Sequence, residues 1–312
     1  MDERYFQEAY AVMNEVKKVV IGKDECVKLA MSAILAGGHI LIEDVPGVGK
    51  TTLAIAFSKA MELENHRVQF TPDVMPADIL GFQMYQKQTG TFEYHPGTIM
   101  CNLFLADEIN RTSPKTQSAL LEVMEEKRVT VDGVTHTLPD PFFVIATQNP
   151  LGSAGTQKLP ESQLDRFMVK LSMGYPDKES EIRILKEETK DSLSLIQPVL
   201  TMEELKQAQQ ACEQIHVEDS MYQYIADLMA ASRSFEAFQT GISPRGAKAL
   251  LRMSRASAFL KGRAYVVPED VLDTFVPVGV HRVQLSPLAK AQGKQEAELL
   301  TELCGEVTMP KP

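Results

Sequence analysis

Residues 39–52 read HILIEDVPGVGKTT, and the rest of the chain can be interpreted from this stretch. The apolar run at 39–43 is bounded by glycine and is too short for a helix, so it predicts a buried strand. A glycine-rich turn follows, and Lys50 opens a helix-forming run that continues to Met61. A strand, a glycine-rich turn and a helix that begins with Lys-Thr form a P-loop, which binds the phosphates of a nucleotide.

The residue types of this turn suit a phosphate. Glycines allow backbone N–H groups to turn inward around it, and the N-terminus of the helix adds about half a positive charge. We expect Lys50 to reach the β- and γ-phosphates and the Thr51 hydroxyl to bind Mg²⁺. The candidate nucleotide-binding residues of the turn are Gly47, Val48, Gly49, Lys50, Thr51 and Thr52.

Asp44 departs from the general pattern G-x-x-x-x-G-K-[ST], because it stands where the pattern has its first glycine. A carboxylate that pointed at the phosphates would be repelled by them, so we expect this side chain to face away. The alternative is a glycine-rich turn with a chance Lys-Thr, which is the usual risk of a short motif. Residues at the ends of other strands help to choose between the two.

Length and composition indicate a globular protein with two domains. The chain has 312 residues, of which 44% are hydrophobic and 24% charged, and this length exceeds the usual size of one domain. No apolar run could span a membrane and the acidic N-terminus is unlike a signal peptide, so we expect a cytoplasmic protein. A net charge of −10 argues against nucleic acid as a partner. Dispersed cysteines and histidines indicate neither disulfides nor a zinc site.

Short apolar runs alternate with helical patterns in the first part of the chain. Buried strands are predicted at 39–43, 67–70, 102–106, 142–146 and 167–171, and amphipathic helices at 3–19, 24–35 and 114–126. Nearly continuous apolar strands that alternate with helices predict a parallel sheet covered on both faces. Two hairpins are expected between these elements, at 82–94 and at 129–138, the second around Asp132-Gly133.

The pattern becomes helical after Tyr175-Pro176. Helices are predicted at 177–190, after the Thr201–Glu204 capping box, and at 219–234, 244–261 and 268–275, with no strand signal of similar strength. We therefore expect an α/β domain at 1–176 and an all-helical domain at 177–312.

Polar side chains follow two of the predicted strands. Asp107 and Glu108 come directly after a buried strand, where α/β sheets present catalytic groups. In a P-loop protein the first acid binds Mg²⁺ and the second can polarise the attacking water. Asn149 follows the strand at 142–146, and its amide could hydrogen-bond the γ-phosphate or that water. Asn-Pro alone is more often a turn.

Two arginines are candidates for contact with a phosphate. Arg166 precedes the strand at 167–171, and from a neighbouring subunit it could stabilise charge on the transferring phosphoryl group. Its usual role at such a position would be a surface ion pair. Arg245 lies in the first turn of the helix at 244–261, where a cation is unfavourable, so an anionic partner would explain it. A solvated arginine remains the alternative.

With these motifs the chain resembles an AAA+ ATPase of the MoxR family. The resemblance covers nearly the whole sequence and rests on Val20-Ile21-Gly22, IEDVPGVGKTT, VQFTPDVMPADILG, LADEINRTSPKTQSALLEVMEE, VIATQNP, LPESQLDRF and SPRGAKALL. It implies an α/β fold with a parallel-sheet P-loop AAA+ core, a helix-2 insert and a second β-hairpin, followed by an all-helical lid domain. Family members resemble this chain at Asp44 too.

The resemblance also implies roles for single residues, with ATP and Mg²⁺ as cofactors. Lys50 and Thr51 would contact phosphate and Mg²⁺, and Asp107 would be the second metal ligand. Glu108 would be the catalytic base. The remaining implied residues are Val20 and Ile21 near the adenine, Asn149 as first sensor, Arg166 as a finger in trans and Arg245 as second sensor. Arg111 matches a family arginine to which we assign no role.

The function implied by this resemblance is a homo-oligomeric ATPase ring, expected to be a hexamer, with a chaperone-like role in maturing other proteins. Its partner would be a separate von Willebrand factor A-type protein, because Asp191-Ser192-Leu193-Ser194 is not the DxSxS metal motif of that module. One alternative is a motor subunit for metal insertion, as in magnesium chelatase. Another is a nucleotide-gated scaffold without turnover, which the presence of both Glu108 and Arg166 argues against.

Overall fold

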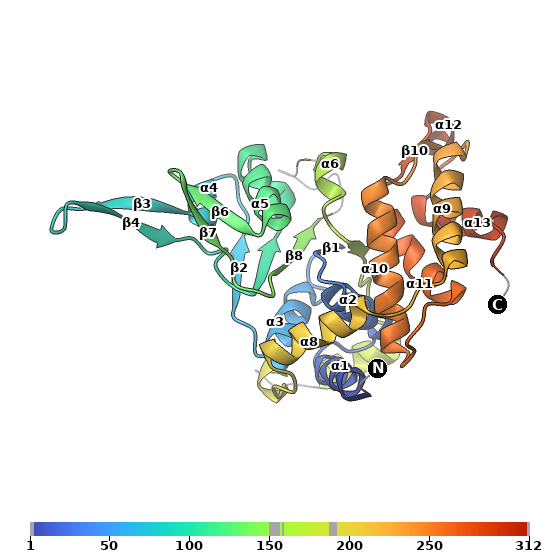
Figure 1. The fold of residues 1–312 in the computed structure, drawn as a ribbon, viewed down its shortest axis with the longest axis horizontal. Coiled ribbons are helices and arrows are strands. Elements are labelled where there is room, and N and C mark those ends of the chain that lie inside the picture. The colour runs from blue at the N-terminus through green and yellow to red at the C-terminus, as the bar shows by residue number, and fades with distance from the viewer. Residues whose placement is uncertain (1–2, 150–156, 158, 187–191, 311–312) are drawn as a thin grey trace.

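The computed structural model describes residues 3–149, 157, 159–186 and 192–310 (Figure 1). Its centre is a parallel sheet of five strands in the order β2-β5-β8-β1-β9. The strands are β1 (Ile40–Glu43), β2 (Asn65–Gln69), β5 (Leu103–Asp107), β8 (Phe143–Gln148) and β9 (Val169–Leu171). All five predicted strands and their parallel arrangement are confirmed, and the bounds differ by at most two residues.

Both faces of the sheet are covered, as is usual for parallel strands that are connected by helices. Successive residues of β5 alternate between two hydrophobic clusters, as the two-residue period of a strand requires. Leu103 and Leu105 belong to the cluster that contains α1 (Glu3–Lys17), α2 (Asp24–Leu35) and α3 (Lys50–Ala60). Phe104 and Ala106 belong to the cluster on the opposite face, which contains α5 (Pro114–Glu126).

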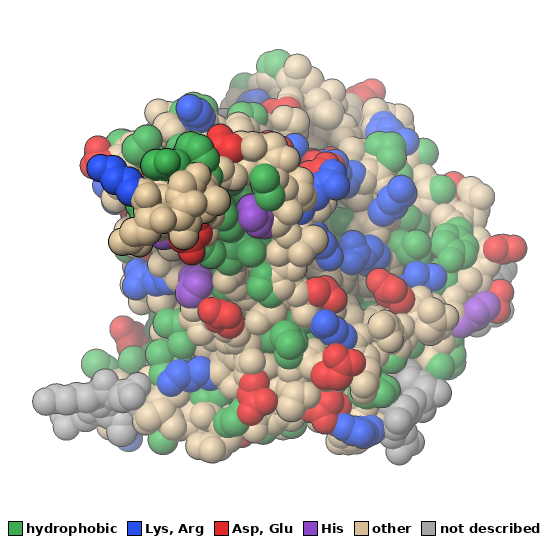
Figure 2. Space-filling view, turned by 60° about the vertical axis from the view of Figure 1, so that its left-hand side comes forward, with side chains coloured by type: hydrophobic (Ala, Val, Ile, Leu, Met, Phe, Trp, Pro, Cys, Tyr) green, Lys and Arg blue, Asp and Glu red, His purple; other side chains and the backbone are tan. Residues whose placement is uncertain are grey.

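Two antiparallel hairpins interrupt the alternation of strands and helices, as expected. After the short helix α4 (Pro76–Leu80), β3 (Gly81–Gln86) pairs with β4 (Thr91–Pro96). This first hairpin projects from the body of the molecule at the left of Figure 1. Figure 2, in which it points toward the reader, shows hydrophobic and charged side chains together there. Its exposed hydrophobic residues are Phe82, Met84, Tyr85 and Phe92.

The second hairpin consists of β6 (Arg128–Val131) and β7 (Val134–Thr137). It follows α5 directly and turns at Asp132-Gly133, where both residues have positive φ angles of +49° and +81°. A turn of this kind needs φ values that glycine and aspartate tolerate.

The remaining helices lie mainly in the second half of the chain. They are α6 (Glu161–Leu164), α7 (Lys178–Lys186), α8 (Met202–Glu213), α9 (Asp219–Ser234), α10 (Pro244–Leu260), α11 (Pro268–Gly279), α12 (Pro287–Ala291) and α13 (Glu296–Glu306), with a 3₁₀ turn at Ser192–Leu195. The predicted extension of α7 to residue 190 lies outside the described residues. In the described part of the chain, no helix is long and apolar enough to cross a lipid bilayer.

The described residues after Pro176 are mainly helical, but they also contain a strand pair and an isolated bridge between His216 and Tyr265. β10 (Phe238–Thr240) and β11 (Gln284–Leu285) form a short antiparallel pair, where only helices were expected. Strands of two and three residues are too short to carry an alternating pattern, so the sequence did not indicate them. Helix α8 begins at the predicted capping box, in which Thr201 Oγ1 accepts a hydrogen bond from the Glu204 N–H. Its Leu205 lies in the same hydrophobic cluster as α1.

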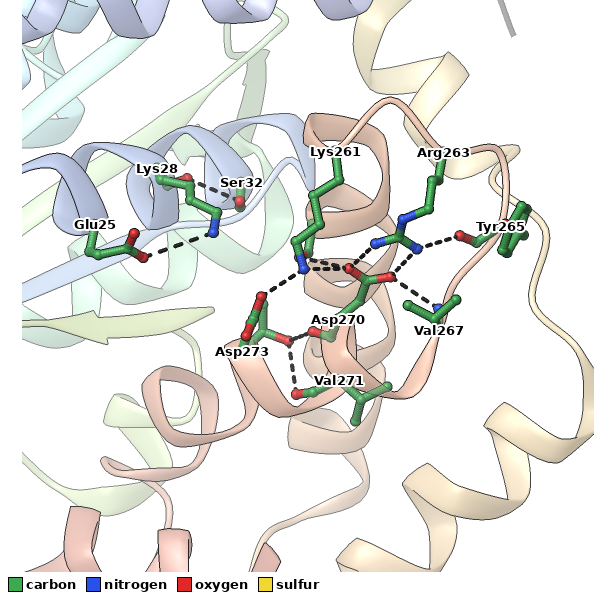
Figure 3. A network of polar contacts seen from close by, with 12 residues as sticks. Glu25, Lys28, Ser32, Lys261, Arg263, Tyr265, Val267, Asp270, Val271 and Asp273 are labelled. Carbon is green, nitrogen blue, oxygen red and sulfur yellow. Dashed lines mark hydrogen bonds and ion pairs between the residues drawn. The ribbon is translucent and has the colours of Figure 1, made fainter. Parts of the chain in front are cut away.

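A buried carboxylate joins the end of α10 to the start of α11 (Figure 3). The Asp270 side chain is fully buried and accepts two hydrogen bonds from Arg263, at 2.6 and 2.7 Å. Lys261 Nζ lies 2.9 Å from Oδ1, and the Val267 N–H donates to Oδ2 at 3.0 Å. Burial opposes ionisation, but these hydrogen bonds outweigh it and hold the pKa of Asp270 below its ordinary value.

We expect Asp270→Asn to lower the free energy of unfolding by about 2–4 kcal/mol, because it removes one partner from a buried ion pair. Asp273→Asn is the control, since Asp273 is half-exposed and pairs only with Lys261, so its loss should cost about 1 kcal/mol or less. The folded pKa of Asp270 lies below the unfolded value of about 3.9. The carboxylate therefore stabilises the fold above that pH and loses its contribution as the pH falls further. Thermal unfolding across a pH series measures both effects, and equal losses in the two variants would contradict the expectation.

Candidate functional site

The turn between β1 and α3 is open toward a cavity. Gly47 and Gly49 have φ angles of +87° and +94°, which glycine adopts at little cost. Gly49 is the N-cap of α3, and Lys50 is the first residue of that helix. Apart from Gly47 itself and its two chain neighbours, no described atom lies within 4 Å of the position that a Cβ at Gly47 would take. The backbone at this turn can therefore approach a ligand closely.

The cavity has a volume of about 360 Å³ and collects residues from four segments. The P-loop contributes most of the lining, and the other residues come from the middle of β2 and from the carboxyl ends of β5 and β8. Its lining residues are Pro46, Gly47, Gly49, Lys50, Thr51, Thr52, Arg67, Asp107, Glu108 and Asn149. The structure thus brings together most of the predicted nucleotide and metal residues, although Val48 packs on the hydrophobic core instead.

Lys50 is largely buried at the base of this cavity. Its Nζ donates a hydrogen bond to the backbone carbonyl of Asp44 at 2.6 Å. Burial lowers the pKa of Lys50, while the nearby carboxylates of Asp44, Asp107 and Glu108 act in the opposite direction. The ammonium group therefore stays inside the loop, where a phosphate would be a favourable partner.

The Asp44 side chain faces away from the cavity, as expected from its place in the motif. Oδ2 accepts hydrogen bonds from the Met173 N–H at 2.5 Å, the Gly174 N–H at 2.8 Å and the Ser172 hydroxyl at 3.0 Å. The carboxylate thus joins the P-loop to the segment that follows β9. This contact explains how an acid can replace the first glycine of the motif.

Asp107 is held by two partners that the sequence did not single out. Oδ1 accepts a hydrogen bond from the Thr147 hydroxyl at 2.6 Å, and Oδ2 forms an ion pair with Arg67 at 2.8 Å. The Thr147 oxygen also accepts the Glu108 N–H at 2.9 Å. A hydroxyl directly after the apolar run Phe143–Ala146 was the signal available for Thr147. Arg67 lies on the exposed edge strand β2 and carried no such signal.

Glu108 has a constrained backbone and a carboxylate in which each oxygen has one hydrogen-bond partner. Its φ angle of +57° is uncommon for a residue other than glycine. Oε2 pairs with Arg111 at 2.7 Å and Oε1 accepts the Asn149 side-chain amide at 2.9 Å. The Arg111 hydrogen bond lowers the pKa of Glu108, burial opposes this, and the Asn149 amide adds to the lowering. Arg111, which had no assigned role, thus holds the Glu108 side chain.

Asn149 has one side-chain atom left for a ligand. Its Nδ2 is used by Glu108, whereas its Oδ1 is buried without a hydrogen-bond partner among the described residues. The backbone carbonyl of Asn149 accepts a hydrogen bond from Asn110 at 3.1 Å. A buried acceptor without a partner is costly, so the side chain is suited to accept a hydrogen bond from a bound molecule.

The other predicted residues lie outside this cavity. Val20 and Ile21 are buried in the hydrophobic interior and do not line it. Arg166 and Arg245 lie on a second cavity, which shares no lining residue with the first, and both pair with Glu125. The structure therefore places the two arginines together but away from the P-loop of their own chain.

Comparison with known proteins relates these residues to a family. A family model described as "ATPase family associated with various cellular activities (AAA)" matches residues 39–169, and one described as "AAA lid domain" matches residues 230–303. Chaperone MoxR1 of Mycobacterium tuberculosis is 35% identical, and the alignment covers 95% of this chain and 81% of the relative. Uncharacterized protein YeaC of Bacillus subtilis is 44% identical, with coverage of 96% and 93%.

A known structure has the same fold. A crystal structure from Cytophaga hutchinsonii, assigned as an ATPase, matches with a TM-score of 0.89 at 36% identity, over 99% of this chain and 96% of that one. The parallel sheet, P-loop and helical lid are those of an AAA+ ATPase, as predicted. Within that class, the chain belongs to the MoxR family.

The contact between Arg111 and Glu108 predicts a change in the pH dependence of ATP hydrolysis. If Glu108 is the base of this reaction, it is active only when it is ionised. Arg111→Met removes the main cause that lowers the pKa of Glu108. We expect the acidic limb of the pH–rate profile to move to higher pH. Arg128→Met removes an exposed pair with Glu126 and should leave the profile in place. If the acidic limb does not shift in the Arg111 variant, Arg111 does not affect the pKa of the group whose ionisation the profile reports.

Proposed function

We propose that the chain is a Mg²⁺-dependent ATP hydrolase whose P-loop cavity binds the triphosphate. The observation that carries this proposal is the single cavity lined by Lys50, Thr51, Asp107, Glu108 and Asn149. In this proposal Lys50 and the backbone N–H groups of the turn hold the β- and γ-phosphates. Asn149 and Glu108 lie across the cavity, where the attacking water would have to be.

The residues on the cavity wall fit a magnesium ion. Thr51 and Asp107 offer a hydroxyl and a carboxylate, which are the hard oxygen ligands that Mg²⁺ prefers. Asp107 Oδ2 already has a cationic partner in Arg67, so the position favours positive charge. Bound Mg²⁺ would neutralise charge on the phosphate oxygens. Arg67 would then release Asp107 and remain on the cavity wall.

Glu108 is the proposed general base for the attacking water. Arg111 and Asn149 fix both oxygens of its carboxylate, and the lowered pKa keeps it ionised. The free Oδ1 of Asn149 is available to accept a hydrogen bond from the same water. Base and acceptor together would orient the water toward the γ-phosphate.

We infer a ring in which each site lies between two subunits, with a hexamer as the expected size. Arg166 and Arg245 do not line the P-loop cavity of their own chain. As a finger and a second sensor they would act on nucleotide held by a neighbour. We retain Val20 and Ile21 as the expected neighbours of the adenine, although neither lines the P-loop cavity.

The biological role that we propose is chaperone-like maturation or assembly of other proteins in the cytoplasm, with a separate von Willebrand factor A-type partner. It rests on family membership, since the relative from Mycobacterium tuberculosis is named a chaperone. Hydrolysis would rotate the lid at 177–312 against the core at 1–176 and move the hairpins, which we place facing a central pore. A metal-insertion motor and a scaffold without turnover remain the alternatives.

Two substitutions separate binding from hydrolysis. Lys50→Ala should weaken ATP binding by about 100-fold, because a charged hydrogen-bond partner of the phosphates is lost. Glu108→Gln should bind ATP normally and reduce turnover by about 10²–10⁴-fold. Lys59→Ala is a matched control on α3, since Lys59 is exposed and, among the described residues, its side chain hydrogen-bonds the Leu193 carbonyl. Calorimetry measures ATP affinity, and phosphate release measures turnover. A wild-type ATP affinity in the Lys50 variant would contradict the assignment of the P-loop cavity as the nucleotide site.

The shared-site ring predicts that specific activity rises with protein concentration and that defective subunits complement one another. Subunits with Arg166→Ala retain Glu108, and subunits with Glu108→Gln retain the arginine. Mixing the two should restore part of the turnover at hybrid interfaces. If hybrid rings form by native mass spectrometry but no mixture recovers activity, Arg166 does not act in trans.

A further inference from the structure

The second cavity has a charge that contrasts with the rest of the protein. It has a volume of about 290 Å³ and lies where the end of α5, the start of β9 and helix α10 meet. Six of its lining residues are lysine or arginine, against two carboxylates, Glu125 and Asp165. The whole chain has a net charge of −10. Such a local excess of positive charge favours an anionic ligand.

Glu125 occupies the two arginines of this cavity. One oxygen of its carboxylate contacts Arg245 on the lid, and the other lies 3.2 Å from Arg166 on the core. Guanidinium groups bind carboxylate and phosphate oxygens in the same geometry. Glu125 therefore takes a position that a phosphate oxygen could also take.

The two arginines have unmet capacity for an anion. Arg166 Nε is buried and has no hydrogen-bond partner among the described residues. Arg245 lies in the first turn of α10, where the helix dipole disfavours a cation. A single carboxylate shared between both arginines leaves donors unused, and a group with more oxygens and more charge would satisfy them better.

The second carboxylate of the cavity has a different, permanent role. Asp165 accepts hydrogen bonds from the Ser243 hydroxyl at 2.9 Å and from Arg282 Nε at 2.7 Å. The Arg282 side chain is only 2% exposed, whereas the Glu125 side chain is 41% exposed. Asp165 is thus held in a buried contact between core and lid, and Glu125 is the carboxylate that can leave.

We propose that Glu125 is a latch, which occupies Arg166 and Arg245 until the terminal phosphate of a nucleotide bound to the neighbouring subunit displaces it. The inference rests on the proposed function, because that nucleotide is the anion it invokes. Ion pairs between partly exposed groups are weak, so a phosphate group can replace the carboxylate. Glu125 then competes with the neighbour's nucleotide for the two arginines and lowers the affinity of the arginines for its terminal phosphate.

Inorganic tripolyphosphate tests the latch without hydrolysis. Its affinity is measured by calorimetry on the 312-residue protein that carries Lys50→Ala, so that the P-loop competes only weakly for the anion. Adding Glu125→Gln should tighten binding by about 3–10-fold, the range expected from removing weak competing ion pairs. Glu122→Gln is the control, since Glu122 is an exposed carboxylate on the same helix, and should leave the affinity unchanged.

Two further results test the anion site and the role of Glu125 separately. Adding Arg166→Ala should weaken tripolyphosphate binding, and its failure to do so would overturn the proposed anion site. An unchanged affinity in the Glu125→Gln protein would overturn the latch. Glutamine keeps the size of the side chain and one acceptor oxygen but loses the charge. An unchanged thermal midpoint together with tighter binding would therefore show that Glu125 does more than support the fold. Because no turnover is required, a protein that fails to hydrolyse ATP would reject the proposed function while leaving this result to stand on its own.

Discussion

The candidate site depends on the parallel pairing of β1, β5 and β8. Strands buried on both faces satisfy their backbone groups only with one another, and parallel pairing sends their carboxyl ends to one edge. The register pairs Ala106 with Ala146, so Asp107 comes to lie beside Thr147. Residues that are about a hundred positions apart in the chain therefore line a single cavity with the P-loop.

The periodic and local features of this arrangement can be predicted from the sequence, but its side-chain partners cannot. Apolar runs locate the sheet, Asp132-Gly133 locates a hairpin, and charge repulsion already indicates which way Asp44 faces. Arg67, Thr147 and Arg111 are different, because each acquires its role from a partner that the fold alone brings within reach. The pairing of Glu125 with two arginines also depends on how the lid sits against the core. The short strands β10 and β11 have no pattern of their own and depend on the packing of the lid.

In both cavities, charged lining residues form ion pairs with oppositely charged residues of the same chain. A partly buried charge without a partner is costly, so a protein that is to bind a charged ligand needs an internal substitute. Arg67 and Arg111 hold the two acids of the P-loop cavity, and Glu125 holds the two arginines of the other. Arg67 has the charge sign of the Mg²⁺ proposed beside Asp107, and Glu125 has the charge sign of the phosphate proposed for the two arginines. Binding would therefore exchange one set of ion pairs for another instead of creating charge interactions from nothing.

The carboxylate of Asp44 has a mechanical consequence. It belongs to the phosphate loop, yet its Oδ2 accepts hydrogen bonds from Ser172, Met173 and Gly174, which lie between β9 and helix α7. These contacts fix the loop to the chain segment that leads into α7. Because a hydrogen bond weakens steeply when its donor and acceptor move apart, the loop and this segment are expected to shift together when a ligand fills the loop.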